Sequence, residues 1–170
     1  MKSVYCFFLI FLGLGFTHAQ QLSISYHNEK AGKYNVGDDC VAVQGYDLIS
    51  YYTENKAIKG SQEYQYTHDE IHYFFTTEAN RKLFASQPEK YLPAYGGFCA
   101  FGIGMPNGFG GSLPGKYPID PETFKIIDER LYLFYNQGGY DALRLWNKAE
   151  DRIKKMADLR WNHMTRKEGK

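Results

Sequence analysis

The sequence predicts one α+β domain in which a small antiparallel sheet, made from two hairpins, packs with several helices and a long C-terminal helix. Two pairs of aromatic and β-branched runs, each pair joined by a short acidic segment, indicate the hairpins. Capping residues before short apolar segments indicate the helices between them. A stripe of apolar residues at spacings of three and four predicts the last helix. No internal repeat is visible in the sequence.

Residues 1–19 are expected to be a secretory signal peptide. Lys2 gives a positive start, and Val4–Phe16 is a nearly unbroken apolar run. The small residues Thr17 and Ala19 stand where a signal peptidase requires them, three positions and one position before the cut. The run is shorter than the roughly 20 residues that a membrane-spanning helix needs. We therefore predict cleavage after Ala19 and an exported bacterial protein, periplasmic or secreted.

The segment that follows, residues 20–39, is polar and has no steady period, so we expect a loosely ordered lead-in to a domain at residues 40–165. Removal of the signal peptide leaves 151 of the 170 residues, which is the length of one ordinary domain. It also leaves 19 basic and 19 acidic side chains. This balance gives no electrostatic reason to bind nucleic acid or an anionic membrane. No second apolar stretch is long enough to span a bilayer.

The first predicted helix begins soon after the domain does. Val41–Val43 is a short apolar piece, and Asp47 then has the side chain to cap a helix that runs to about Thr53. The helix is expected to bury three apolar residues, Leu48, Tyr51 and Tyr52.

Two runs rich in aromatic and β-branched residues, Glu63–Thr67 and Ile71–Thr76, predict the first hairpin. Its turn falls at Asp69–Glu70, which lacks the glycine that usually supplies positive φ. A two-residue turn there places His68 and His72 on opposite faces of the hairpin. A metal shared by these two histidines is therefore not expected.

A pair of short helices is predicted to follow. Thr77 is a suitable cap for a helix that carries Leu83 and Phe84, and Pro88 begins another helical turn that runs to Tyr91. The stretch Gly102–Gly115 holds six glycines and two prolines, so it is predicted to be a surface loop.

The second hairpin is predicted from Phe124–Ile127 and Leu131–Tyr135, around a turn at Asp128–Arg130. A single long helix is then expected from Asp141 to about His163. Its apolar stripe consists of Ala142, Trp146, Ala149, Ile153, Ala157 and Trp161.

Two cysteines remain after the predicted cleavage, Cys40 and Cys99. Outside the cytoplasm they have the chemistry to form a disulfide that closes a long loop. If a helix starts near Gly97, Cys99 lies in its first turn, where the helix dipole favours a thiolate for soft-metal or nucleophilic chemistry. A buried, inert cysteine is the third alternative. The sequence leaves these three roles open.

The motifs described so far resemble the exported, single-domain branch of the YHS family. The resemblance covers about Val41–Ala100 well and continues more loosely through Ile126–Asn136. Six separate segments carry it in order: Gly45–Tyr52, Lys56–Ser61, Tyr73–Phe75, Asn80–Phe84, Pro88–Tyr91 and Tyr95–Ala100.

The resemblance has consequences for metal binding. YHS domains attached to copper-transporting ATPases are thought to bind metal through cysteines, and the three corresponding positions here hold Gln44, Thr76 and Asn80. An amide or a hydroxyl does not replace the charge of a thiolate, so the three-cysteine site is not expected. Any remaining site for copper or zinc must use Cys99, with His72 as the best available partner.

The resemblance and the expected export together imply a non-catalytic module of the cell envelope that binds a metal ion or another small ligand. A structural or protein-interaction domain, stabilised by a Cys40–Cys99 disulfide, is the first alternative. A thiol-dependent enzyme that uses Cys99 with a histidine base is the second, although no local Cys-His signature supports it.

Overall fold

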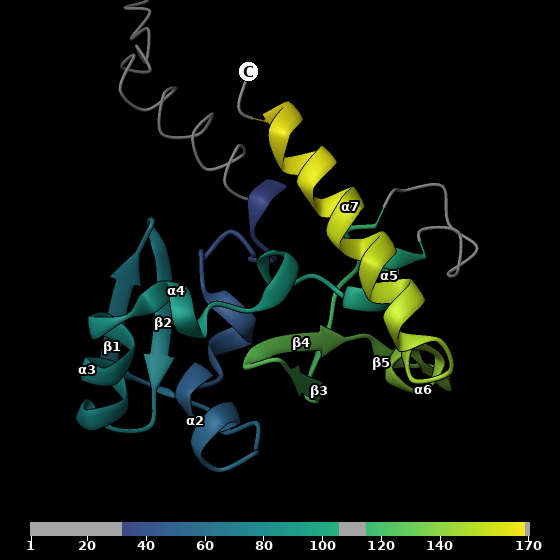
Figure 1. The fold of residues 1–170 in the computed structure, drawn as a ribbon. Helices are drawn as coiled ribbons and strands as arrows, with labels where there is room; N and C mark the ends of the chain where they lie inside the picture. The colour runs from purple at the N-terminus through teal and green to yellow at the C-terminus, as the bar shows by residue number, and fades with distance from the viewer. Residues whose placement is uncertain (1–31, 106–114, 169–170) are drawn as a thin grey trace, which may run out of the picture.

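The computed structural model describes residues 32–105 and 115–168, which form an α+β domain (Figure 1). The predicted fold class is confirmed, because several helices pack with small antiparallel sheets and a long helix ends the domain. The two predicted hairpins form separate two-stranded sheets. No helix in the described part of the chain has the length and apolar character needed to cross a membrane. The predicted signal peptide at residues 1–19 lies outside the described residues.

The first half of the domain is a turn, a helix, a hairpin and two further helices. Both predicted caps are present, because the Asp47 side chain accepts a hydrogen bond from Ile49 N–H and the Thr77 side chain accepts one from Asn80 N–H. The elements of this half are the 3₁₀ helix η1 (Ala42–Gly45), α2 (Leu48–Thr53), β1 (Ser61–His68), β2 (Ile71–Phe75), α3 (Glu78–Ser86) and α4 (Pro88–Tyr91).

The first hairpin has the predicted register. His72 pairs with Thr67, and the chain reverses at Asp69 and Glu70, whose φ values are 50° and 65°. The two-residue turn therefore adopts the left-handed backbone that matches strand twist, although neither residue is a glycine. Side chains alternate along β2, so that its core face is buried while His72 on the other face is half-buried.

The second half begins with another turn and short helix. Here α5 includes the first residues of the predicted loop Gly102–Gly115, because Gly104 lets the helix pack tightly on α7. A Cβ atom at Gly104 would lie 2.6 Å from Ile153 Cγ2. The elements are η2 (Ala94–Gly97), α5 (Ala100–Gly104), β3 (Asp120–Ile127), β4 (Arg130–Phe134), β5 (Asn136–Gln137), β6 (Tyr140–Asp141), α6 (Ala142–Trp146) and α7 (Glu150–Glu168).

The prediction of one continuous C-terminal helix from Asp141 is wrong, because α6 ends at Trp146 and α7 begins at Glu150. Tertiary contacts explain the break. The Trp146 indole N–H donates to Glu150 Oε2 at 2.9 Å, and the same carboxylate pairs with Lys125 of β3. These contacts outweigh the continuous apolar stripe, which by itself favours a single helix.

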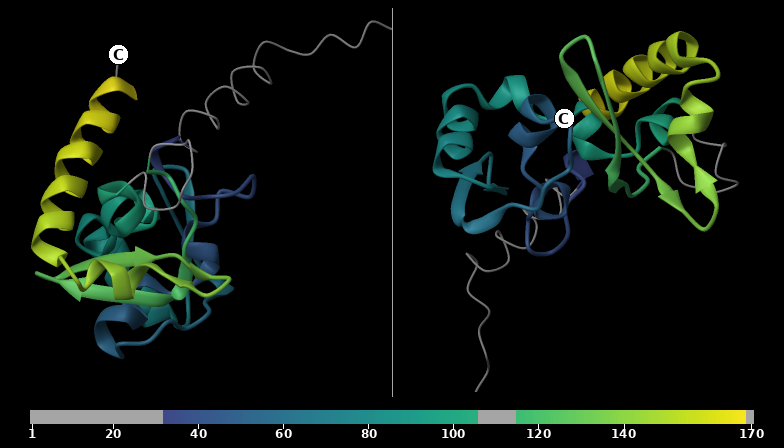
Figure 2. Two further views of the ribbon diagram at one scale, coloured as in Figure 1. Left: turned by 90° about the vertical axis from the view of Figure 1, so that its right-hand side faces the viewer. Right: turned by 90° about the horizontal axis from the view of Figure 1, so that it is seen from below.

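The two halves share one order of elements, a repeat that the sequence did not predict. Each half runs from a 3₁₀ turn through a short helix and a hairpin to another helix. The second hairpin also reverses at an acidic pair with positive φ, Asp128 at 50° and Glu129 at 59°. Figure 1 shows the first half on the left and the second half on the right, and the right-hand view in Figure 2 shows them side by side.

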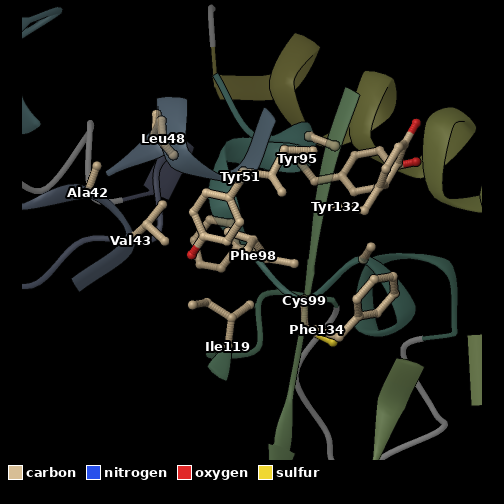
Figure 3. Close-up of a cluster of buried hydrophobic side chains, with 14 of the residues drawn as sticks. Ala42, Val43, Leu48, Tyr51, Tyr95, Phe98, Cys99, Ile119, Tyr132 and Phe134 are labelled. Atoms are coloured by element: carbon tan, nitrogen blue, oxygen red, sulfur yellow. The ribbon is translucent and has the colours of Figure 1, made fainter. Parts of the chain in front are cut away.

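The corresponding aromatic contacts are also repeated. In the first half, Phe84 packs against Tyr73 and Phe75, with ring centroids 4.8 and 5.1 Å away. In the second half, Trp146 packs against the two aromatic residues Tyr132 and Phe134 of β4, at 5.8 and 5.4 Å. Buried side chains from both halves join in one core (Figure 3).

Candidate functional site

Cys99 is the N-cap residue of α5, which begins at Ala100 and not near Gly97, so Cys99 precedes the first turn of the helix, and its surroundings disfavour a thiolate. The side chain is fully buried, and α5 has only five residues. The Cys99 sulfur accepts a hydrogen bond from Tyr135 N–H at 3.3 Å. Burial raises the pKa of the Cys99 thiol in spite of this bond. Figure 3 shows Cys99 among the buried hydrophobic side chains of the core, so the structure favours the inert alternative.

The second cysteine, Cys40, is half-buried and lies next to His72. The Cys40 carbonyl accepts a hydrogen bond from His72 N–H at 2.8 Å. Both described cysteines are free, so the Cys40–Cys99 disulfide considered above is absent from the structure. The structure thus brings His72 to the backbone of Cys40, whereas Cys99 makes its polar contacts with Tyr117 and Tyr135 of the second half.

Within residues 32–105 and 115–168, no group of three or more His, Cys, Asp or Glu side chains is arranged to hold a metal ion. The soft-metal pair of Cys99 and His72 stays a prediction, to which the structure adds no third ligand. His72 Nδ1 instead lies 3.1 Å from the Gln65 amide nitrogen and 3.0 Å from the Thr67 hydroxyl.

The three positions that correspond to the missing cysteines separate into two places. Thr76 and Asn80 come together around Asp47, which is fully buried. Asp47 Oδ2 accepts hydrogen bonds from Thr76 N–H, the Thr76 hydroxyl and the Asn80 amide, each at 2.8 Å. Gln44 lies elsewhere and donates to the Ile119 carbonyl at 3.1 Å. A buried carboxylate thus occupies the corner, and its hydrogen bonds replace the water that it loses.

Sequence reasoning assigned Asp47 only as a helix cap. The cap is real, since Asp47 Oδ1 accepts from Ile49 N–H at 2.8 Å. The other three donors belong to residues 29 and 33 positions further along the chain. No local pattern points to such partners, so this network could not be predicted from spacing.

A cleft of about 730 Å³ lies between the two halves, and we call it the junction cleft. Buried aromatic residues from each half, Tyr73 and Tyr95, line it, and Trp161 of α7 forms another side. The turns of both hairpins contribute charged side chains. The lining includes Lys33, Tyr34, His68, Asp69, Glu89, Lys90, Asp128, Glu129 and Arg130.

Charged side chains of the junction cleft differ in how far they are already paired. Lys33 Nζ lies 3.6 Å from Asp69 Oδ2, and His68 Nε2 lies 3.1 Å from Glu89 Oε1. The Arg130 guanidinium lies over the Tyr95 ring, 5.7 Å from its centroid. By contrast, the Asp128 and Glu129 carboxylates form no ion pair with any described residue. The second hairpin therefore presents one cation and two carboxylates at the cleft.

One wall of the junction cleft is made by the end of the predicted lead-in. Asn35 N–H donates to the Gly96 carbonyl at 2.8 Å, and the Asn35 amide donates to the Gly97 carbonyl at 2.9 Å. Gly96 has a φ of +61°, and a Cβ atom there would lie only 2.0 Å from the Lys33 carbonyl oxygen. A glycine at position 96 is thus what allows the N-terminal segment to close the wall.

The fold and this cleft define a class of protein: a small α+β domain with two corresponding halves and a ligand-sized cleft between them. No family model, curated protein or solved structure matches the chain. The likeness to the YHS family therefore depends on the sequence motifs alone.

Proposed function

We propose that this chain is an exported, YHS-like domain that acts as a non-catalytic small-ligand-binding module of the cell envelope, with its ligand in the junction cleft. One observation carries the proposal: the cleft combines an aromatic floor with a few charged groups that converge from both halves. Ligand sites in proteins have this composition, because aromatic surface supplies affinity and charged groups fix orientation.

The side chains available for binding support an organic ligand over a metal ion. The described residues hold no cluster of metal-ligating side chains. Thr76 and Asn80, at two of the positions where ATPase-linked relatives have cysteines, are engaged by Asp47. The junction cleft is lined by the cations Lys33, Lys90 and Arg130 together with carboxylates and aromatic rings, which favours a ligand with both apolar and charged parts.

Binding is also better supported than thiol catalysis. A nucleophilic cysteine needs a depressed pKa and a nearby base, and Cys99 has a raised pKa in a fully buried position. The cleft contains a histidine, His68, but this ring is engaged with Glu89.

The proposal is tested by titrating the purified protein with choline, 4-hydroxybenzoate and tyrosine, which represent a cation, an anion and a zwitterion with apolar parts. Trp161 lines the cleft, so its emission should change on binding, and a ligand of the native state should raise Tm. Replacement of Arg130 by alanine should weaken binding of the anion or the zwitterion, and replacement of Glu129 by alanine should weaken binding of the cation or the zwitterion. The exposed Lys148→Ala variant is the matched control and should bind as the wild type does.

Failure of all three probes to change either the emission or Tm would contradict the ligand-binding proposal. An effect that survives in both cleft variants would place the ligand elsewhere. Export is tested separately by the intact mass of the protein recovered from the bacterial envelope, which should lack residues 1–19.

A further inference from the structure

A second cavity, of about 720 Å³, lies on the face of the first hairpin that carries His72 and Phe74. The segment from Asn35 to Gln44 and residues Pro118 and Ile119 enclose it. We call it the amide pocket, because four of its lining residues are Asn or Gln. It shares Asn35, Val36 and Val43 with the junction cleft, but it contains neither Tyr95 nor Trp161 nor the charged turns, so it lies on the other side of this wall.

Ionic charge is nearly absent from the amide pocket. Lys59 and Asp39 are its two permanently charged side chains, and they have opposite signs. The remaining polar side chains are His72 and the four amides of Asn35, Gln44, Gln62 and Gln65. Such a lining offers many hydrogen bonds without attracting a strongly charged ligand.

Three of these amide side chains donate hydrogen bonds through their nitrogens to other described residues, while their oxygens accept none. Asn35 donates to the Gly97 carbonyl at 2.9 Å, and Gln44 donates to the Ile119 carbonyl at 3.1 Å. Gln65 donates toward His72 Nδ1 at 3.1 Å. The side-chain oxygens of these three amides accept no hydrogen bond from the described residues, so the pocket retains three acceptors.

Donors are also available in the same place. An amide nitrogen can only donate, so the contact with Gln65 makes His72 Nδ1 an acceptor and leaves the proton of the neutral ring on Nε2. His72 Nε2–H is then a donor, and the Lys59 ammonium, which donates one hydrogen bond to the Gln44 carbonyl, has further N–H groups. Gln62 is exposed, and its side chain has no partner among the described residues, so it offers both a donor and an acceptor.

Apolar surface completes the amide pocket. Phe74 is half-buried and lies against the backbone of Gly45, where an added Cβ atom would be 3.0 Å from Phe74 Cδ2. Val41 and Ile119 also line the pocket. The ring thus contributes apolar surface to the lining.

We propose that the amide pocket binds a neutral carbohydrate. Each sugar hydroxyl both donates and accepts a hydrogen bond, which matches a site that offers amide oxygens beside His72 and Lys59 donors. The apolar C–H face of the sugar ring packs on Phe74. A small anion fits less well, because the lining includes the Asp39 carboxylate and amides whose nitrogens are already engaged, and a cation is opposed by Lys59.

The test uses maltose, cellobiose and sucrose as probes, with binding measured by isothermal titration calorimetry and by saturation-transfer NMR. At least one disaccharide should bind, with an affinity that is insensitive to salt because the ligand is neutral. Gln62→Ala and Lys59→Met should each weaken that binding about fivefold, the effect of one hydrogen bond. Gln137→Ala, which changes an exposed glutamine of β5, is the control and should have no effect.

Absence of heat and of saturation transfer with all three disaccharides would overturn the proposal. Binding that is unchanged in the Gln62→Ala and Lys59→Met double variant would also overturn it, because the sugar would then lie elsewhere. Salt-sensitive binding of acetate or inorganic phosphate, without sugar binding, would identify an anion site instead. Trp161 lines the junction cleft and does not line the amide pocket. A change in its emission with choline, 4-hydroxybenzoate or tyrosine therefore neither supports nor contradicts sugar binding in the amide pocket.

Discussion

The two halves of the domain place different polar groups at one corresponding position. Asp47 comes two residues after the 3₁₀ turn of the first half, and Cys99 comes two residues after the turn of the second. Each accepts the backbone N–H of the residue that follows the last strand of its hairpin. Thr76 N–H donates to Asp47 at 2.8 Å, and Tyr135 N–H donates to the Cys99 sulfur at 3.3 Å.

The two halves share a backbone arrangement but differ in the side chain that completes it. In each half, the residue after the last strand has a buried backbone N–H that requires a hydrogen-bond acceptor. A carboxylate has two oxygens and collects further donors, whereas a thiol accepts weakly and packs as a small apolar group. Asp47 accordingly organises a polar network, and Cys99 belongs to the apolar core.

The largest expected effect comes from the aromatic residue that covers each hairpin. Trp146→Ala and Phe84→Ala should each lower the free energy of unfolding by about 3–5 kcal/mol, because both side chains are fully buried. Urea denaturation followed by circular dichroism measures this loss. Since the halves share one core, each variant should unfold in a single transition. A loss below about 1 kcal/mol in either variant, or two separate unfolding transitions, would contradict the view that Trp146 and Phe84 have equivalent roles in one shared core.

Replacement of Asp47 should destabilise the protein more than replacement of Cys99. Asp47→Ala should lower the free energy of unfolding by about 3 kcal/mol, because several buried donors lose their acceptor. Cys99→Ala should cost about 1 kcal/mol, since one weak hydrogen bond and a sulfur atom are lost. Asp141→Ala is the control for a cap alone, because that half-buried side chain accepts one bond from Arg144 N–H, and about 1 kcal/mol is expected. Equal losses for Asp47 and Cys99 would refute the difference.

The pH dependence of stability offers a finer distinction. Burial raises the pKa of the Cys99 thiol, so the unfolded chain loses this proton first. The contribution of the protonated Cys99 thiol to the free energy of unfolding is complete below the pKa of a cysteine in the unfolded chain, about 8.5. This contribution is lost as the pH rises toward the raised pKa of the folded state. One group contributes a slope of at most about 1.4 kcal/mol per pH unit. Denaturation between pH 8 and about pH 10 should therefore show a shallower decline in Cys99→Ala than in the wild type.

The smallest expected effect tests the two hairpin turns. Glu70 and Glu129 both have positive φ, which strains an L-residue, whereas glycine adopts it freely. Glu70→Gly and Glu129→Gly should each stabilise the protein by about 0.5 kcal/mol, after the entropic cost of glycine in the unfolded chain. Thermal denaturation should give a similar small rise in Tm for both. Stabilisation of one turn and destabilisation of the other would show that the turns are not equivalent.

Local signals in the sequence were sufficient for the hairpins and the short helices. Alternating aromatic residues fixed the strands, and the turn at Asp69 and Glu70 followed from their register. Asp47 and Thr77 were predicted as caps and act as caps. These features depend on residues a few positions apart, which is the range over which pattern arguments work.

Features that involve distant partners were not predictable in this way. The helix break after Trp146 depends on Lys125 of another strand, and the cleft wall depends on contact between Lys33 and Gly96. One signal for the repeat was present, because both hairpins turn at an Asp-Glu pair. Its elements differ too much in length and chemistry for a comparison of sequences to detect it.

The close contact at Gly96 also brings the N-terminal segment of the described chain to the last helix. A Cβ atom there would lie 2.0 Å from the Lys33 oxygen and 3.1 Å from Trp161 Cη2, so the N-terminal segment and the last helix meet on this residue. Domains whose ends are close tolerate circular permutation. A linker from the end of α7 back to the N-terminal segment, with new termini opened at the exposed turn of Asp69 and Glu70, should therefore preserve the fold.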